Sequence, residues 1–279
     1  MPLAPPPVTL AGTLTNARIK SYPAKEVVQV SNVDIFRRSP YYEDENGNPP
    51  PRGYDVPSKG QAANPDRADE ESRRRARNAV QDIALCNRFT HMFTWTLSPE
   101  LVNRYDADAV YKKVRASLSH LTQRKGFRYV CIPELHKDGA IHMHGLCMLG
   151  NVQLAPSVRA NGTMRRDGAG RQVCNMTDWS WGWSTCVRLD SNYERACNYV
   201  SKYITKAETK IFGKWYLSSR DLKKRPDVYP LEHIPYDDYR ESLAQTGQTV
   251  KERTVYRDVK MIVTEYIKKN GVMTNDTAR

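Results

Sequence analysis

The sequence lacks several features that would have assigned it to a familiar class. None of its 279 residues form an apolar run long enough to span a bilayer, and the Pro-rich start at residues 1–8 lacks the apolar segment of a secretion signal. The six cysteines include no Cys-x-x-Cys pair, which argues against a zinc ribbon. No Gly-x-x-x-x-Gly-Lys-Ser/Thr motif is present either. These absences predict a cytoplasmic protein with no membrane partner and no nucleotide-driven motor of its own.

Positive charge is what the sequence has in excess. Its 43 Lys and Arg against 31 Asp and Glu give a formal net charge of +12, which points to an anionic partner. Residues 151–176 combine arginines with turn-forming Asn-Gly and Asp-Gly pairs and predict a basic loop. A charge run taken alone is more often a solvated face than a binding site. The candidate DNA-binding residues are Arg165, Arg166 and Arg171 in this loop and Lys223 and Lys224 in a later basic turn.

Composition divides the chain into three parts. Residues 1–66, rich in Pro, Gly and Asn, predict an irregular N-terminal arm with at most one short strand. Residues 67–226 begin with a basic helix at 67–86 and then alternate strand and helix patterns. That order predicts an α+β fold, a central antiparallel sheet with helices covering one face. Residues 227–279 predict a C-terminal extension that can add an edge strand.

The most informative stretch is residues 128–150, which predict a β-hairpin. Two runs of β-forming residues flank Lys137-Asp138-Gly139, a loop that suits glycine at its left-handed position. This loop sets the register and pairs Leu135 with Ile141. Pro133 weakens the prediction, because proline inside a strand implies an edge or a bulge.

The predicted register brings three metal-binding side chains together. Glu134 lies across from His142, and His144 points to the same face two residues later. One carboxylate and two imidazoles can bind a divalent ion and leave positions open for a substrate, and they suit Mg²⁺ or Mn²⁺ as well as Zn²⁺. The alternative is that both histidines are ordinary strand residues with hydrogen-bonded rings.

Residues 190–206 predict an amphipathic helix with a polar border. Tyr199 and Tyr203 are one turn apart at the edge of its apolar face, and Lys202 and Lys206 lie just beyond them. A phenol with a pKa near 10 needs a metal-polarised electrophile or a nearby cation to attack a phosphodiester. Tyrosines at this spacing more often pack against neighbouring side chains. A catalytic role is therefore expected only if the helix faces the two histidines.

Three motifs in this order resemble one known family. Residues 93–97 (Phe-Thr-Trp-Thr-Leu), 142–144 (His-Met-His) and 199–206 (Tyr-Val-Ser-Lys-Tyr-Ile-Thr-Lys) are similar to the motifs of HUH-type rolling-circle replication initiators. The name stands for histidine, hydrophobic residue, histidine, and members serve plasmids and small single-stranded DNA phages. The resemblance covers about residues 70 to 220.

The resemblance implies an enzyme that nicks and joins single-stranded DNA at a replication origin. Its domain, residues 67–226 here, would have an antiparallel sheet of about five strands covered by helices. Glu134, His142 and His144 would hold Mg²⁺ or Mn²⁺, and a tyrosine would attack the DNA to leave a 5′-phosphotyrosine and a free 3′-hydroxyl. Tyr203 is expected to act first, because it matches the Val-x-x-Tyr-x-x-Lys form of single-tyrosine members, with Tyr199 second.

The family likeness also implies partners in a bacterial host cell. Since the chain has no helicase domain, strand separation would fall to a host helicase and extension of the 3′-hydroxyl to a host polymerase. Two other functions fit the residues. One is a metal-dependent phosphoesterase that uses activated water and leaves no covalent adduct. The other is a non-catalytic basic nucleic-acid-binding protein with structural histidines.

Overall fold

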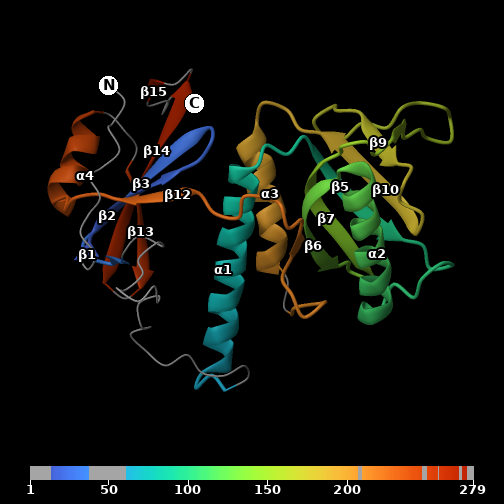
Figure 1. The fold of residues 1–279 in the computed structure, drawn as a ribbon, viewed down its shortest axis with the longest axis horizontal. Coiled ribbons are helices and arrows are strands. Elements are labelled where there is room, and N and C mark those ends of the chain that lie inside the picture. Colours follow the sequence, from blue (N-terminus) through green and yellow to red (C-terminus); the bar gives the residue numbers. More distant parts are fainter. Residues whose placement is uncertain are drawn as a thin grey trace. The chain divides into compact units, whose positions relative to one another are not determined.

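The computed structural model describes residues 14–37, 61–206, 209–246, 250–256, 258–269 and 272–274. The chain divides into two compact units, one of residues 58–225 and one that combines residues 1–57 with 226–279 (Figure 1). In the ranges given above, no helix has the length and apolar character needed to cross a membrane.

An antiparallel sheet of seven strands forms the centre of residues 58–225, in the order β11-β6-β7-β5-β10-β9-β8. β5 is the middle strand. The short β8 and β11 flank five longer strands, so the predicted α+β class with about five strands is confirmed. The strands are β5 (His91–Leu97), β6 (Arg128–Leu135), β7 (Ile141–Met148), β8 (Leu154–Pro156), β9 (Val173–Met176), β10 (Gly182–Arg188) and β11 (Leu217–Ser218).

Helices cover both faces of this sheet, whereas the sequence predicted one covered face. α2 (Ala107–Lys125) packs on one face, and α1 (Pro65–Cys86) and α3 (Tyr193–Lys206) lie together on the other (Figure 1). The reason is visible in β6, where Cys131 faces α2 while Val130 and Ile132 face α1 and α3, all 0% exposed. A strand that is apolar on both sides must be covered on both sides.

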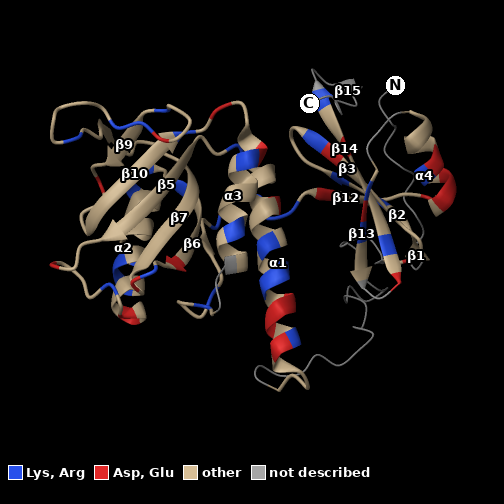
Figure 2. Cartoon of the chain, turned by 180° about the vertical axis from the view of Figure 1, so that it is seen from behind, with Lys and Arg blue, Asp and Glu red and all other residues tan. Residues whose placement is uncertain are grey.

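Local signals explain where the helices begin. The Asn64 side chain caps α1 by accepting a hydrogen bond from the Arg67 amide, with Pro65 following in the first turn. The Asp106 side chain caps α2 by accepting hydrogen bonds from the amides of Asp108 and Ala109. Figure 2 shows acidic residues in the first turns of α1 and basic residues in its middle; Asp66 in the first turn favours the helix dipole, and the last turn has no basic residue.

The predicted hairpin register is confirmed. β6 and β7 pair Glu134 with His142, and Gly139 in the connecting loop has a φ of 84°. Pro133 causes no shift in register. β11, the other neighbour of β6, pairs with it only two and three residues before the proline, so the missing amide hydrogen interrupts no bond there.

The second unit contains a sheet in the order β12-β2-β3-β14-β13, with β15 paired to β14. α4 contributes tyrosines to one apolar cluster with β2 and β3. A separate pair joins β1 and β4. The elements are β1 (Leu14–Thr15), β2 (Ala17–Ser21), β3 (Lys25–Ser31), β4 (Phe36–Arg37), β12 (Asp227–Pro230), α4 (Tyr236–Gln245), β13 (Lys251–Tyr256), β14 (Val259–Lys269) and β15 (Val272–Thr274).

This unit differs from the predicted arm and extension. Residues 14–37 hold four strands, and the C-terminal β14 lies between β3 and β13 instead of at an edge. The partners are far apart in sequence, as in the pairing of Ile262 with Val30, so local composition gave no sign of them. The rest of the predicted arm lies outside the described residues.

Candidate active site

The three predicted metal ligands lie on the α3 face of the sheet, at the hairpin end of β6 and β7. The Nε2 atom of His144 is 2.8 Å from the Oε2 atom of Glu134. Adjacent ligand atoms around a small divalent ion with bonds of about 2.1 Å are about 3 Å apart, so this pair suits such an ion by chemistry and spacing.

His142 occupies a different position from the pair. Its ring centroid is 6.4 Å from that of His144 and 5.0 Å from that of His136, on which it stacks. Burial, followed by the neighbouring His136, lowers the pKa of His142 and favours the neutral imidazole. Among the described residues, no group of three His, Cys, Asp or Glu side chains has the geometry of a metal site.

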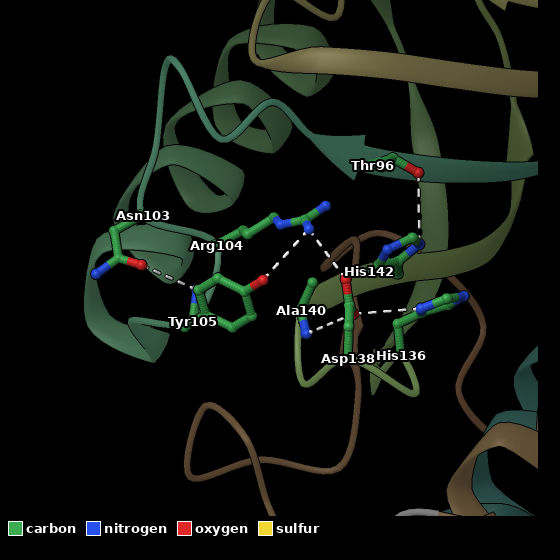
Figure 3. A network of polar contacts seen from close by, with 8 residues as sticks. All are labelled: Thr96, Asn103, Arg104, Tyr105, His136, Asp138, Ala140 and His142. Atoms are coloured by element: carbon green, nitrogen blue, oxygen red, sulfur yellow. Dashed lines mark hydrogen bonds and ion pairs between the residues drawn. The ribbon is translucent and has the colours of Figure 1, made fainter.

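Two threonines of β5 orient the histidines. Thr94 Oγ1 is 3.1 Å from Nδ1 of His144, and Thr96 Oγ1 is 3.4 Å from Nδ1 of His142, as Figure 3 shows for the second pair. The register of β5 and β7 places each threonine directly opposite its histidine. Because the Nδ1 atoms are occupied, the Nε2 atoms are the ones available to a ligand. Sequence reasoning missed this role, although the alternation of threonines beside the His-Met-His strand is its signal.

A polar network fixes the hairpin tip (Figure 3). Asp138 accepts hydrogen bonds from Arg104 Nη2 at 2.9 Å and the Ala140 amide at 3.1 Å, and its Oδ1 is 3.2 Å from His136 Nδ1. The Ala140 amide first, and then His136 and Arg104, lower the pKa of Asp138 and keep it ionised. The network therefore holds His136 in place beside His142, an arrangement that the sequence did not predict.

The structure brings one of the two candidate tyrosines against the histidines. The ring of Tyr203 stacks on that of His144, with centroids 4.1 Å apart and an interplanar angle of 3°. Tyr203 is 7% exposed and donates a hydrogen bond of 2.7 Å to the hydroxyl of Tyr199, which is 48% exposed. The sequence placed both phenols at one edge of the helix, but only Tyr199 is accessible from solvent.

The two phenols differ electrostatically as well. Burial first, and then the hydrogen bond to Tyr199, raise the pKa of Tyr203 and keep it protonated. Lys202 is exposed on the same helix. The side chain of Lys206 lies outside the described residues.

A cavity of about 530 Å³ adjoins Tyr199. Its wall includes Met92 of β5, Ala196 of α3 and the loop around Ala169. Arg171, predicted to bind DNA, lies in this wall and is paired with Asp167 at 2.7 Å and Asp190 at 3.0 Å. The predicted basic loop thus closes the cavity, and Arg171 holds it in place.

The other four predicted DNA-binding residues differ in exposure and in their contacts. Arg165 and Lys223 are exposed. Arg166 donates to the Gly170 carbonyl at 2.7 Å. Lys224 donates to the Ser218 hydroxyl at 3.0 Å, and burial lowers its pKa. Arg166 and Lys224 therefore have structural contacts within the protein.

Comparison with known proteins gives one match. Residues 90–208 match the model of the family described as replication-associated protein ORF2/G2P. This range contains β5, the hairpin and α3, which carry the two threonines, Glu134, the histidines and both tyrosines of the site. No curated protein and no solved structure matches the chain. The match indicates a replication-associated protein.

Proposed function

We propose that this protein nicks and rejoins single-stranded DNA at a replication origin by tyrosine transesterification. The observation that carries the proposal is the contact chain from Tyr199 through Tyr203 and His144 to Glu134. The phenols, which can act as nucleophiles, are thereby connected to the Glu134–His144 pair, which can bind a divalent ion. All four residues lie within the range that matches the replication-associated family.

Glu134, His144 and His142 would hold the ion, Mg²⁺ or Mn²⁺. When bound, it supplies positive charge that polarises the scissile phosphate. Thr94 and Thr96 fix the ring orientations of the two histidines. His142, stacked on His136, would complete the set as the third ligand.

Tyr199 would attack first, whereas the sequence suggested that Tyr203 attacks first. An exposed phenol is open to a DNA strand, whereas Tyr203 is buried against His144. The Tyr199 oxygen bonds to phosphorus while the bond to the 3′-oxygen breaks, which leaves a 5′-phosphotyrosine and, after proton uptake, a 3′-hydroxyl. The hydrogen bond donated by Tyr203 stabilises the Tyr199 oxygen as it loses its proton.

Rejoining follows from the same chemistry. A 3′-hydroxyl attacks the phosphotyrosine, restores the DNA phosphodiester and releases the phenol, so the energy of the cleaved ester is retained. Host helicase and polymerase would separate the strands and extend the 3′-hydroxyl between the two events.

The test is to incubate labelled single-stranded DNA from the protein's own genetic element with Mn²⁺ or with chelator and to run a denaturing gel. The proposal expects label that migrates with protein, depends on Mn²⁺ and is absent in Tyr199→Phe/Tyr203→Phe. Tyr229→Phe, which alters an exposed phenol of β12 in the other unit, serves as the matched control and retains activity.

The single variants decide the order of attack. Tyr199→Phe should abolish single-turnover nicking, and Tyr203→Phe should reduce it. The reverse pattern would restore Tyr203 as the first nucleophile. Metal-dependent cleavage without an adduct would instead support a phosphoesterase, and binding without cleavage would support a non-catalytic DNA-binding protein.

A further inference from the structure

A second cavity, of about 590 Å³, lies beside the edge strand β11 on the α2 side of the same unit. We call it the β11 cavity. Its wall is shared by α2, the start of β6 and the segment around β11. Its polar and aromatic lining includes Tyr111, Arg115, Tyr129, Lys214, Tyr216 and Arg220.

Three cations of the β11 cavity have no partner within the part of the chain that the structure describes. Arg115, Lys214 and Arg220 are exposed and form no ion pair or side-chain hydrogen bond there. The described lining contains no Asp or Glu. Arg171 in the other cavity differs, because two carboxylates neutralise it. An unneutralised cluster of this kind favours an anionic ligand.

Aromatic rings accompany the cations. Tyr111, Tyr129 and Tyr216 are each partly exposed, and Phe212 supports the Tyr111 ring at a centroid distance of 5.1 Å. Burial raises the pKa of Tyr129 and of Tyr216, so both remain neutral. Neutral rings beside free cations are the combination with which proteins hold the bases and phosphates of single-stranded nucleic acid.

We infer that the β11 cavity binds single-stranded DNA at nucleotides outside the nicking site. The inference deepens the proposed function and rests on it for the identity of the ligand. Tyr129 and Glu134 are five residues apart on β6 and face opposite sides of the sheet, at least about 17 Å apart along the strand. A stacked DNA strand rises about 3.4 Å per nucleotide along its axis, so at least about five nucleotides are needed to reach from one site to the other.

The test compares two arginines of one helix. Arg115 and Arg124 are both exposed on α2 and unpaired within the described residues, but only Arg115 lines the cavity. Binding of oligodeoxythymidylate is measured across salt concentrations in the Tyr199→Phe/Tyr203→Phe background, which prevents covalent trapping. Arg115→Gln should lower the affinity and reduce the salt slope by about 0.7, the value for one phosphate contact of a single strand. Arg124→Gln should leave both unchanged.

A triple variant enlarges the effect. Arg115→Gln/Lys214→Gln/Arg220→Gln should reduce the salt slope by about 2 and the affinity on the order of tenfold. Equal behaviour of Arg115→Gln and Arg124→Gln, or an unchanged slope in the triple variant, would overturn the inference. Thermal unfolding of each variant ensures that only folded proteins are compared.

Two further arms separate this inference from the proposed function. With both tyrosines retained, the triple variant should nick a short oligonucleotide that covers only the scissile site at the wild-type rate. If nicking fails in every protein while the Arg115 effect persists, the proposed function falls and the DNA contact stands. Thymidine monophosphate distinguishes a DNA strand from a free nucleotide as the ligand. It should not displace oligodeoxythymidylate from the wild type, and it should bind the wild type and the triple variant with the same affinity. Displacement from the wild type, with weaker binding to the triple variant, would assign the cavity to a free nucleotide.

Discussion

The two faces of β5 and β7 have opposite roles although they belong to the same strands. Phe93, Trp95 and Met143 face α2, are at most 1% exposed and belong to one apolar cluster. Thr94 and His144, their direct neighbours in sequence, face α3 and carry the polar contacts of the site. Because strand side chains alternate between faces, adjacent residues can serve stability and chemistry separately.

The division is local to one end of the sheet. Val130, Ile132 and Leu146 also face α3, yet they are 0% exposed and pack against α1 and α3. Only the hairpin end of this face is polar. The comparison therefore predicts that neighbouring substitutions at that end separate loss of activity from loss of stability.

The largest effect is expected for His144→Ala. Loss of a ligand on the chemical face should lower single-turnover nicking by at least about 10³-fold, because the positive charge at the phosphate is lost. The free energy of unfolding should fall by about 1 kcal/mol, the size of the lost stacking on Tyr203, which is less than for truncation of an apolar core residue. Nicking kinetics and urea unfolding measure the two quantities; normal nicking with Mn²⁺ would remove His144 from the site.

Met143→Ala, one residue away, should show the reverse pattern. The side chain is 0% exposed in the α2-side core, so its truncation leaves a cavity and lowers the free energy of unfolding by about 2–5 kcal/mol. The nicking rate per folded molecule should remain near that of the wild type. A large loss of rate with unchanged stability would mean that the two faces are not separate.

An effect of intermediate size is expected for Thr94→Val, which tests whether the Thr94 hydroxyl orients the His144 ring. Removal of the hydroxyl 3.1 Å from His144 Nδ1 should weaken Mn²⁺ binding about 10- to 100-fold. Thr94→Ser, which keeps the hydroxyl, is the matched control. Thr96→Val should have a smaller effect, because its contact with His142 is longer at 3.4 Å. Titration calorimetry with Mn²⁺ gives the affinities without reference to catalysis; equal affinity in Thr94→Val would show that the contact is not supportive.

The smallest effect is expected for Asp167→Asn, in the loop that closes the cavity beside Tyr199. Burial alone would raise the pKa of Asp167, but hydrogen bonds from Arg171 and the Ala169 amide lower it below the usual 3.8. The carboxylate therefore contributes stability above that pH, and the contribution is lost as the pH falls through the lowered pKa.

At neutral pH Asp167→Asn should cost less than about 1 kcal/mol, since the pair with Arg171 is partly open to solvent. The difference between variant and wild type should vanish in acid. Urea unfolding at several pH values measures it, and a difference that grew in acid would contradict the assigned direction.

Much of the hairpin was predictable because its determinants are local. Gly139 fixes the turn, and the turn fixes which residues oppose one another, so the pairing of Glu134 with His142 follows from a few neighbouring residues. The apolar face of α3 was predictable for the same reason, since Cys197, Val200 and Ile204 recur with helical spacing.

The sequence by itself therefore determined the register of the hairpin, the helices near it and the residue types that can hold a metal or attack a phosphate. Tertiary structure alone decided that Tyr203 is buried against His144 while Tyr199 is exposed, since this depends on how α3 packs on β7. It also decided that residues near both ends share one sheet. The physical reason is range: turns and periodicity act over a few residues, whereas burial and strand pairing join residues separated by much of the chain.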